Sequence, residues 1–369
     1  MSNQIMQKLV IGDLAAQYPI IQGGMGVGIS GANLASAVAN EGGIGVISSV
    51  GLGLFDLDQN SNYKDANAIK LREEIRKAKR KTNGLLGVNL MQVASDFDNL
   101  IQISVEEKID IVFISAGLPL KNPFNMPESE LKKIKIKFIP KISSERAARL
   151  IFEHWERKYN HIPDAIVIEG PLSGGHQGFK KENIDDPKFS LEKLLPKVIE
   201  IIKPFEIKFK KNIPVIAAGG IYTGYDIHKF IKLGASAVKM GTRFVTTEEC
   251  DAADEFKQQY IHCAKDDIVI IDSPVGLPAR VIKNKFIEEM QKGIKKPIVC
   301  PWKCLKTCDF RSVPYCIAKA LMNAKQGNFV EGFAFAGTNA YKAEKIISVK
   351  ELFKTLLNEY KECAVPVQC

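Results

Sequence analysis

The sequence predicts an α/β fold, a TIM (β/α)8 barrel with a helical, cysteine-containing insertion after the eighth strand. Eight short runs rich in Val and Ile alternate with longer amphipathic segments, and eight parallel β/α units close naturally into a barrel. The 369 residues suit one such barrel with additions. A doubly wound open sheet is the rival fold, but it usually has fewer strands and a Gly-rich turn after the first one.

The expected strands are apolar almost throughout, as strands buried on both faces are. Four of the eight end in Gly, which is typical of a junction between a strand and a loop. They cover residues 19–24, 43–50, 85–90, 109–117, 136–142, 165–170, 213–220 and 235–242.

Helices are expected between these strands. Residues 31–42 have small and apolar side chains at helical spacing and end at a Gly. Residues 143–159 open with a Ser cap and continue as an amphipathic helix, and 224–234 form a short helix that ends at Gly234.

The alternation of strands and helices stops near residue 249. We therefore expect a barrel at 1–248, a helical insertion or lid at 249–330 packed over one end of it, and a C-terminal segment at 331–369. This last segment contains an amphipathic helix at 348–362 that packs on the barrel.

The formal net charge of +9 does not indicate nucleic acid as a partner. Lys and Arg are scattered, and their one concentration, at 70–81, is interrupted by Glu73 and Glu74 and suits a solvated helix face. A nucleic-acid interface would need a basic stripe with interleaved aromatic residues. The charge fits a small anionic substrate or cofactor equally well.

The N-terminal residues show no signal peptide, and no apolar run is long enough to span a bilayer. We therefore expect a cytoplasmic protein with no membrane partner. A homo-oligomer is compatible with the sequence, which contains no feature that requires one.

Two glycine loops predict a phosphate site. The ends of the seventh and eighth expected strands carry Gly219, Gly220, Gly241 and Thr242. In TIM barrels the loops after these two strands frequently bind phosphate through backbone N–H groups. The alternative is a pair of ordinary glycine turns. A phosphate at this position suits FMN, whose ring would then lie across the barrel mouth.

The ring of such a cofactor would meet residues at the ends of other strands. The uncharged, glycine-rich loop after the first strand contains Gly23, Gly24 and Met25, and it would let the backbone approach a planar ring closely. Asn89 and Lys141 end the third and fifth strands, where an amide and a cation could bond the polar edge of the ring. The alternatives are a tight barrel turn, a capping Asn and a solvated Lys.

His176 follows the sixth expected strand, behind Gly174 and Gly175. Catalytic residues of TIM barrels lie at the carboxyl ends of the strands. Histidine titrates near neutral pH, which suits a general acid or base, and the glycine pair would let the loop approach a flat cofactor. The alternative is a structural histidine in a loop that needs glycines for its turn.

Five motifs occur in order over about residues 8–250. They are "PIIQGGMGVGISGANLASAVANEGGIGVIS", "GVNL", "EGPLSGGHQGF", "IPVIAAGGI" and "KMGTRFVTTEEC". As a set they resemble the FMN-dependent nitronate monooxygenases, formerly called 2-nitropropane dioxygenases. Close relatives of that family are the flavin-dependent enoyl-acyl carrier protein reductases of the FabK type.

The resemblance implies an oxidoreductase in which His176 matches the family's catalytic histidine and assists proton abstraction from a nitroalkane. The nitronate would pass an electron to FMN, and oxygen would be consumed. Positive charge near the site, for which Lys141 is a candidate, would favour an anionic substrate. The resemblance implies that FMN lies, without a covalent bond, against the Gly24–Met25 loop, Asn89, Gly174, Gly175, Gly219, Gly220, Gly241 and Thr242.

Two other functions stay open. One is an NAD(P)H-dependent enoyl-acyl carrier protein reductase of the FabK type. The other is a flavin- or cluster-binding electron carrier or partner protein, in which His176 is structural. The chain departs from the family pattern at residues 335–340, where "FAGTNA" stands in place of a "GQ" motif that many members carry, and in its insertion.

Four of the eight cysteines lie close together in that insertion, as Cys300, Cys304, Cys308 and Cys316. In a reducing compartment this predicts metal or redox chemistry rather than disulfides. Four thiolates within such a short segment could hold zinc or an iron–sulfur cluster. Zinc sites more often contain a pair separated by two residues, and no such pair exists here. Iron–sulfur is the favoured metal prediction, because a redox cluster beside a flavin has an obvious role. The alternative is a set of reduced, buried cysteines that pack as small apolar side chains.

Overall fold

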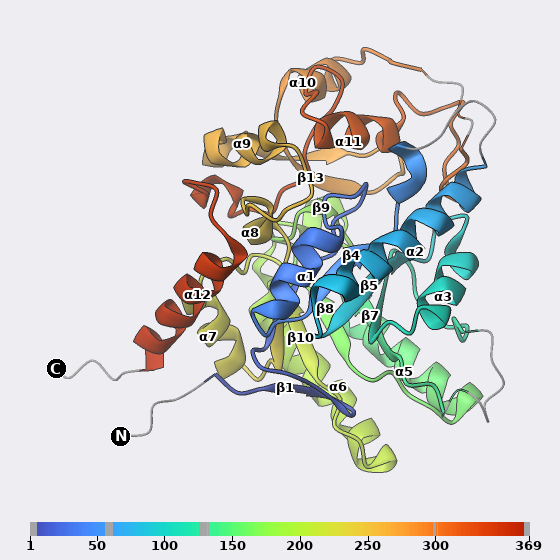
Figure 1. Ribbon diagram of the computed structural model, residues 1–369, viewed down its shortest axis with the longest axis vertical. Helices are drawn as coiled ribbons and strands as arrows, with labels where there is room; N and C mark the ends of the chain where they lie inside the picture. Colours follow the sequence, from blue (N-terminus) through green and yellow to red (C-terminus); the bar gives the residue numbers. More distant parts are fainter. Residues whose placement is uncertain are drawn as a thin grey trace.

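Eight parallel strands form a closed barrel at the centre of the computed structural model, which describes residues 6–55, 62–124, 131, 133–297, 300 and 302–364 (Figure 1). The strands follow the order β3-β11-β10-β8-β7-β6-β5-β4, and a parallel bridge between Ile21 and Ile44 closes the ring. The predicted TIM barrel and its eight strands are therefore confirmed. The strands are β3 (Ile20–Gln22), β4 (Gly45–Ser48), β5 (Leu86–Met91), β6 (Ile111–Ser115), β7 (Lys137–Ile142), β8 (Ile166–Glu169), β10 (Val215–Ala218) and β11 (Ala237–Met240).

Helices surround the barrel and include all those that the sequence predicts. Ser144 caps one of them by accepting a hydrogen bond from the backbone N–H of Ala147 at 3.2 Å, which explains where that helix begins. None of the helices in the described residues has the length and apolar character needed to cross a membrane. The surrounding helices are α1 (Ala32–Asn40), α2 (Tyr63–Lys81), α3 (Phe97–Glu106), α5 (Glu145–Tyr159), α6 (Leu191–Phe209), α7 (Gly224–Lys232), α8 (Thr242–Val245) and α12 (Val349–Ala364).

The barrel strands alternate between two apolar clusters. On β6, Ile111 and Phe113 join an inner cluster, while Val112 and Ile114 join the larger cluster beneath the helices. The inner cluster also includes side chains of a short hairpin, β1 (Leu9–Ile11) and β2 (Leu14–Ala16). Because side chains two positions apart face the same side of a strand, residues that continue the inner rows toward the carboxyl ends point into the barrel mouth.

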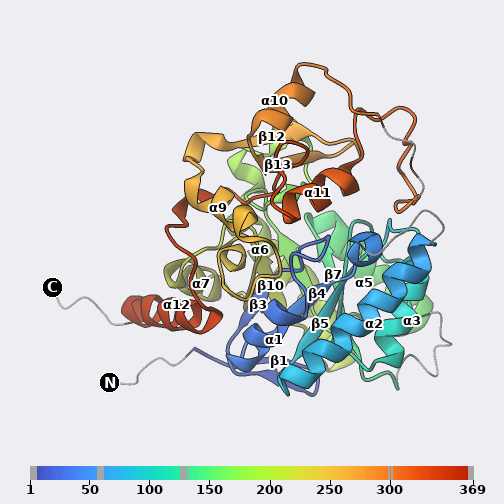
Figure 2. The ribbon, with the colours of Figure 1, turned by 45° about the horizontal axis from the view of Figure 1, so that its top comes forward.

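A separate layer covers that mouth (Figure 2). Its centre is a three-stranded antiparallel sheet in the order β12-β13-β9, in which β9 belongs to the loop after β8. The insertion therefore contains a β-hairpin in addition to the predicted helices. Its elements are β9 (Gly175–His176), α9 (Asp254–His262), β12 (Ile268–Asp272), β13 (Pro278–Ile282), α10 (Lys285–Gln291) and α11 (Ile317–Lys325). Short 3-10 turns lie at Leu52–Phe55, Lys181–Asn183, Pro187–Phe189, Lys265–Asp267 and Ala340–Lys342.

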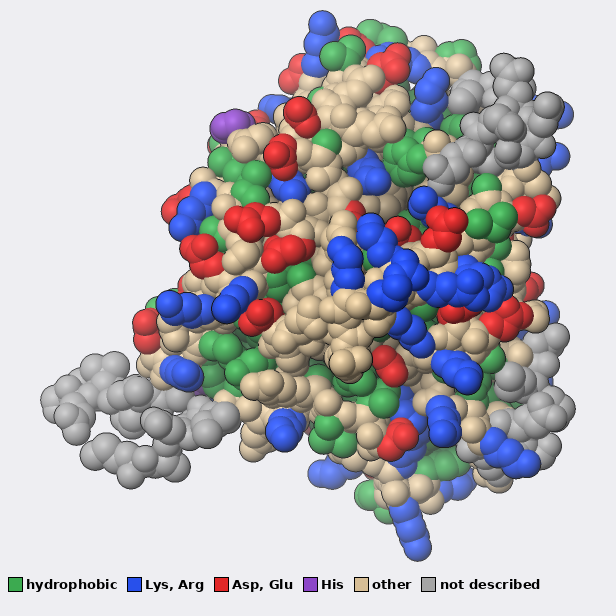
Figure 3. Space-filling model, viewed as in Figure 1, with side chains coloured by type: hydrophobic (Ala, Val, Ile, Leu, Met, Phe, Trp, Pro, Cys, Tyr) green, Lys and Arg blue, Asp and Glu red, His purple; other side chains and the backbone are tan. Residues whose placement is uncertain are grey.

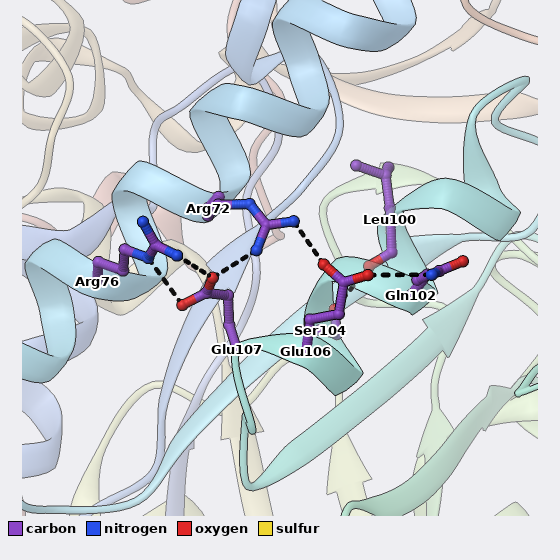
Figure 4. A network of polar contacts seen from close by, with 7 residues as sticks. All are labelled: Arg72, Arg76, Leu100, Gln102, Ser104, Glu106 and Glu107. Carbon is purple, nitrogen blue, oxygen red and sulfur yellow. Dashed lines mark hydrogen bonds and ion pairs between the residues drawn. The ribbon is translucent and has the colours of Figure 1, made fainter.

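The basic run predicted as a solvated helix face lies on α2, where Lys and Arg side chains gather in Figure 3 with acidic side chains among them. Part of its charge is neutralised by the end of α3 (Figure 4). Arg72 contacts Glu106 and Glu107, each at 2.6 Å, and Arg76 contacts Glu107 at 2.8 Å. These pairs join two neighbouring helices and support the prediction that α2 has a structural, solvated surface.

Candidate active site at the barrel mouth

His176 is held at the barrel mouth by residues from the covering layer. On β9 it pairs with Ala279 of β13, and its Nε2 lies 2.8 Å from Oγ of Ser273. Its ring packs edge-on against Phe335 at a centroid distance of 5.0 Å. The imidazole is thus fixed by contacts that come from the segment after the eighth barrel strand.

The surroundings of His176 favour its neutral form. Burial, together with the positive charge of Lys141, lowers the pKa of His176 to about 4. At neutral pH the ring can therefore accept a proton. When Nε2–H donates to the Ser273 hydroxyl, Nδ1 carries the lone pair that a substrate proton could reach.

The loop before His176 is fixed by Arg280 of β13. The guanidinium of Arg280 is buried and donates hydrogen bonds to the carbonyls of Pro171 and of Ser173, the second at 2.8 Å. Gly174 is needed for close packing, because a Cβ there would lie 2.6 Å from the backbone of Gly337. The structure thus gives this glycine a packing role, and its contact with a flavin stays a prediction.

The two predicted phosphate loops lie together with a third segment. The backbone N–H of Gly337 donates to Oγ1 of Thr242 at 2.9 Å, and the Asn339 amide donates to the carbonyl of Gly220 at 2.7 Å. Gly219 and Gly220 have φ angles of +97° and +79°, a region that favours glycine. The "FAGTNA" segment, which departs from the family pattern in sequence, is therefore part of this end of the site.

A half-buried cation lies next to these loops. Arg243 directly follows Thr242, and its guanidinium lies 4.7 Å from the centroid of the Tyr222 ring. Nε of Arg243 is buried without a hydrogen-bond partner among the described residues. A hydrogen-bond donor left without a partner beside glycine loops fits the phosphate of a mononucleotide.

The residues predicted to face a flavin ring also converge. A Cβ on Gly24 would lie 2.5 Å from Cβ of Asn89, so the first loop packs directly on the end of β5. The backbone N–H of Gly23 donates to the carbonyl of Met240 at 2.7 Å, next to Gly241. A Cβ on Gly241 would meet only Met25, at 3.9 Å, so the backbone faces open space at this point. Close backbone approach and open space fit a flat ring system.

Three charged side chains continue the inner rows of the barrel. Nζ of Lys141 lies 2.9 and 2.8 Å from the two carboxylate oxygens of Glu169. The ammonium of Lys239 lies 4.1 Å from the centroid of the Phe113 ring. Burial lowers the pKa of Lys239 to about 7, and Lys141 adds to this effect while Glu169 opposes it. The floor of the site therefore carries positive charge that an anion could stabilise.

Several of these residues were not predicted from the sequence. Glu169 and Lys239 lie within strand segments. The only signal in the sequence that they have a functional role is that each is a charged residue in an otherwise apolar run. The others come from the covering layer. Among them, the sequence distinguishes only those in the "FAGTNA" segment, because this segment departs from the family pattern. These residues of the covering layer are Ser273, Arg280, Phe335, Gly337 and Asn339.

The four clustered cysteines lie outside this site. Burial, together with the nearby Cys316, Cys300 and Cys308, raises the pKa of Cys304 to about 12. Among the residues that the structure describes, no group of three or more His, Cys, Asp or Glu side chains stands in a metal-binding arrangement. Metal binding by these cysteines therefore stays a prediction.

The chain is similar to a known family and to characterised proteins. The profile of a family described as nitronate monooxygenase matches residues 7–359. A probable nitronate monooxygenase of Staphylococcus haemolyticus is 29% identical, over 79% of this chain and 81% of that protein. A (3aS,4S,5R,7aS)-5-hydroxy-7a-methyl-1-oxo-octahydro-1H-indene-4-carboxyl-CoA dehydrogenase of Mycobacterium tuberculosis is 28% identical, over 76% of this chain and 67% of that protein.

A solved structure of FabK from Thermotoga maritima is similar to the whole chain. It has a TM-score of 0.73 and 29% sequence identity, and the match covers 95% of this chain and 94% of that one. A nitroalkane oxidase from Streptomyces ansochromogenes has a TM-score of 0.71 at 21% identity, over 95% and 97% of the two chains. The second likeness supports the fold.

Proposed function

Since the chain belongs to the nitronate monooxygenase family and is an oxidoreductase of that type, we propose that it uses FMN to oxidise nitroalkanes and nitronates with oxygen. The observation that carries the proposal is the neutral His176 at the barrel mouth, held by Ser273. Such a group can take a proton from carbon, and the adjacent nitro group stabilises the resulting anion.

FMN would be held by the residues that converge at the mouth. The backbone at Gly219–Gly220 and Gly241–Thr242, together with Arg243, would bind its phosphate. Gly24 and Asn89 would contact its ring. When bound, FMN supplies the acceptor for electrons that leave the substrate anion.

His176 would act as the general base for neutral nitroalkanes. The hydrogen bond with Ser273 orients the ring, so that Nδ1 can receive the proton from the carbon that bears the nitro group. A preformed nitronate has already lost this proton and does not need the base. Comparing the turnover of the two substrates therefore distinguishes an effect on proton abstraction from an effect on any later step.

The charged floor of the barrel would stabilise the substrate anion. Lys141 is held in place by Glu169, and Lys239 lies above Phe113. Because burial brings the pKa of Lys239 to about 7, a neighbouring anion would favour its protonated, positive form. These cations would therefore favour the binding of an anionic nitronate over that of a substrate that stays neutral.

Anaerobic mixing tests the proposal. The FMN-loaded protein is mixed without oxygen with a nitronate in one experiment and with NADPH in another, and the flavin absorbance is followed. We expect the nitronate to bleach the flavin rapidly and oxygen consumption to follow when air is admitted. Rapid bleaching by NADPH, with none by the nitronate, would support the enoyl-acyl carrier protein reductase alternative and would end the proposal.

A second candidate function is dehydrogenation of a coenzyme A thioester. It is favoured by the Mycobacterium tuberculosis relative, which is a carboxyl-CoA dehydrogenase and whose match includes most of this chain. His176 could take a proton next to a thioester carbonyl by the same geometry. In the anaerobic experiment an acyl-CoA, and not the nitronate, would then bleach the flavin.

A further inference from the structure

The segment that carries the four cysteines is docked on the barrel next to the end of β5 (Figure 2, dark orange). Leu305 forms an antiparallel bridge with Ala94, and the backbone N–H of Ser95 donates to the carbonyl of Cys304 at 3.0 Å. The N–H of Lys306 donates to the carbonyl of Val93 at 2.8 Å. The barrel residues that make these contacts follow Asn89 by only a few positions in the chain. The segment therefore lies beside β5, the strand that would contact the flavin ring.

The path of the backbone brings the four cysteines together. The N–H of Lys296 donates to the carbonyl of Pro314 at 2.8 Å, which joins the two ends of the segment. A turn between Leu305 and Cys308 folds its middle back on itself. Cys300, Cys308 and Cys316 all lie within electrostatic range of Cys304.

The polar surroundings of the segment are incompletely satisfied. The hydroxyls of Tyr63 and Ser95 and Oδ1 of Asp96 are buried without a hydrogen-bond partner among the described residues. Tyr63 lies within electrostatic range of Cys304, and the backbone N–H of Ser95 donates to the carbonyl of Cys304. Unpartnered O–H donors beside cysteines fit a group with exposed sulfur acceptors.

The charge of the segment favours an anionic centre. Between positions 303 and 319 the chain carries four cations, Lys303, Lys306, Arg311 and Lys319, and one acid, Asp309. A metal centre with four thiolate ligands carries net negative charge, which surrounding cations offset.

We propose that Cys300, Cys304, Cys308 and Cys316 bind an iron–sulfur cluster beside the end of β5. An iron–sulfur cluster, unlike zinc, could exchange electrons with a flavin bound beside β5. The side chains do not stand in a coordinating arrangement in the metal-free chain, so binding requires them to rotate toward a common centre. The proposal is independent of the substrate that His176 serves.

Metal analysis tests this site. The full-length protein is purified without oxygen, incubated with ferrous iron and sulfide, desalted, and analysed for iron, acid-labile sulfide and zinc. We expect iron and sulfide in similar amounts per chain, with visible absorption that dithionite bleaches. Zinc that stays bound through the incubation, or neither metal after it, would overturn the proposal.

Matched serine variants tie the metal to these cysteines. Cys308→Ser alters a half-exposed member of the set, and Cys363→Ser alters a half-exposed cysteine on α12 as the control. We expect iron and sulfide to fall severalfold in the first variant and to stay at the wild-type level in the second. Circular dichroism and FMN content show that both variants are folded. Equal iron in Cys308→Ser and the wild type would contradict the proposed ligands.

Discussion

The loops after β10 and β11 and the loop after β8 meet at one end of the barrel, but they are held by different parts of the chain. The first two are shaped by their own glycines, such as Gly219, with its φ of +97°. The third carries His176 and depends on Ser273 and Arg280, which lie about a hundred positions later. The cofactor end thus belongs mainly to the barrel, and the proton-transfer end belongs to the layer that covers it.

This difference makes the two ends separable by mutation. Changes in the glycine loops should lower flavin affinity and stability together, because the barrel itself is distorted. Changes in the covering layer should alter proton abstraction more than flavin binding. The predictions below follow this division from the largest expected effect to the smallest.

Gly219→Ala should have the largest effect on stability. A Cβ there would lie 2.7 Å from the carbonyl oxygen of Gly170, in a backbone conformation that alanine rarely adopts. We expect a loss of about 4 kcal/mol from the sum of clash and strain, and weaker FMN binding. Gly276→Ala is the control, since φ is +78° but no atom lies within 4 Å of the added Cβ. Urea unfolding and flavin titration measure both; equal losses in the two variants would show that contact with Gly170 is unimportant.

Arg280→Leu should cost about 3 kcal/mol, because it leaves the buried carbonyls of Pro171 and Ser173 without their donor. Nitroalkane turnover should fall further than FMN affinity, since His176 follows this loop. Arg149→Leu, which removes a cation that is 61% exposed, is the matched control and should change stability by less than about 0.5 kcal/mol. A variant that loses FMN but keeps its turnover per bound flavin would argue against the division.

Ser273→Ala should reduce nitroalkane turnover about fivefold, the rate equivalent of one hydrogen bond of about 1 kcal/mol. FMN affinity and turnover of preformed nitronate should remain at the wild-type level, because the other partner of the Ser273 hydroxyl, the backbone N–H of Val275 at 3.4 Å, belongs to the covering layer. Steady-state oxygen consumption with the two substrates measures this. An equal decrease with both substrates would mean that Ser273 acts on the site as a whole.

Glu107→Gln should cost at most about 1 kcal/mol and leave both ends of the site unchanged. Hydrogen bonds from Arg76 and then from Arg72 hold the pKa of Glu107 below its ordinary value of 4.5. A carboxyl with a lowered folded pKa stabilises the fold above its unfolded pKa and loses this contribution as pH falls through its folded pKa. The stability difference between variant and wild type should therefore be present at pH 7 and shrink below about pH 4. A difference that is independent of pH would exclude the ion pairs as its cause.

The barrel was predictable because the sequence patterns that specify its strands and loops are local. Each parallel strand is buried on both faces and is visible as an apolar run, and the glycines of the cofactor loops stand directly at the ends of these runs. The same logic placed His176 at the mouth through the strand that precedes it.

The covering layer was less predictable because it depends on non-local pairing. The strand that carries His176 has two residues, too short to recognise, and its partner β13 lies about a hundred positions away. No local pattern connects Ser273 or Phe335 with His176. Lys239 was hidden for another reason, since it lies within an apolar strand and its burial emerges only when the barrel closes.

The most direct test of the central claim, that His176 is the base, is the ratio of nitroalkane to nitronate turnover in His176→Asn. The account predicts that turnover of the neutral nitroalkane falls about 10²–10⁴-fold, the usual contribution of a general base, while nitronate turnover per bound FMN changes little. Equal turnover ratios in the variant and the wild type would contradict it and would leave His176 a structural residue.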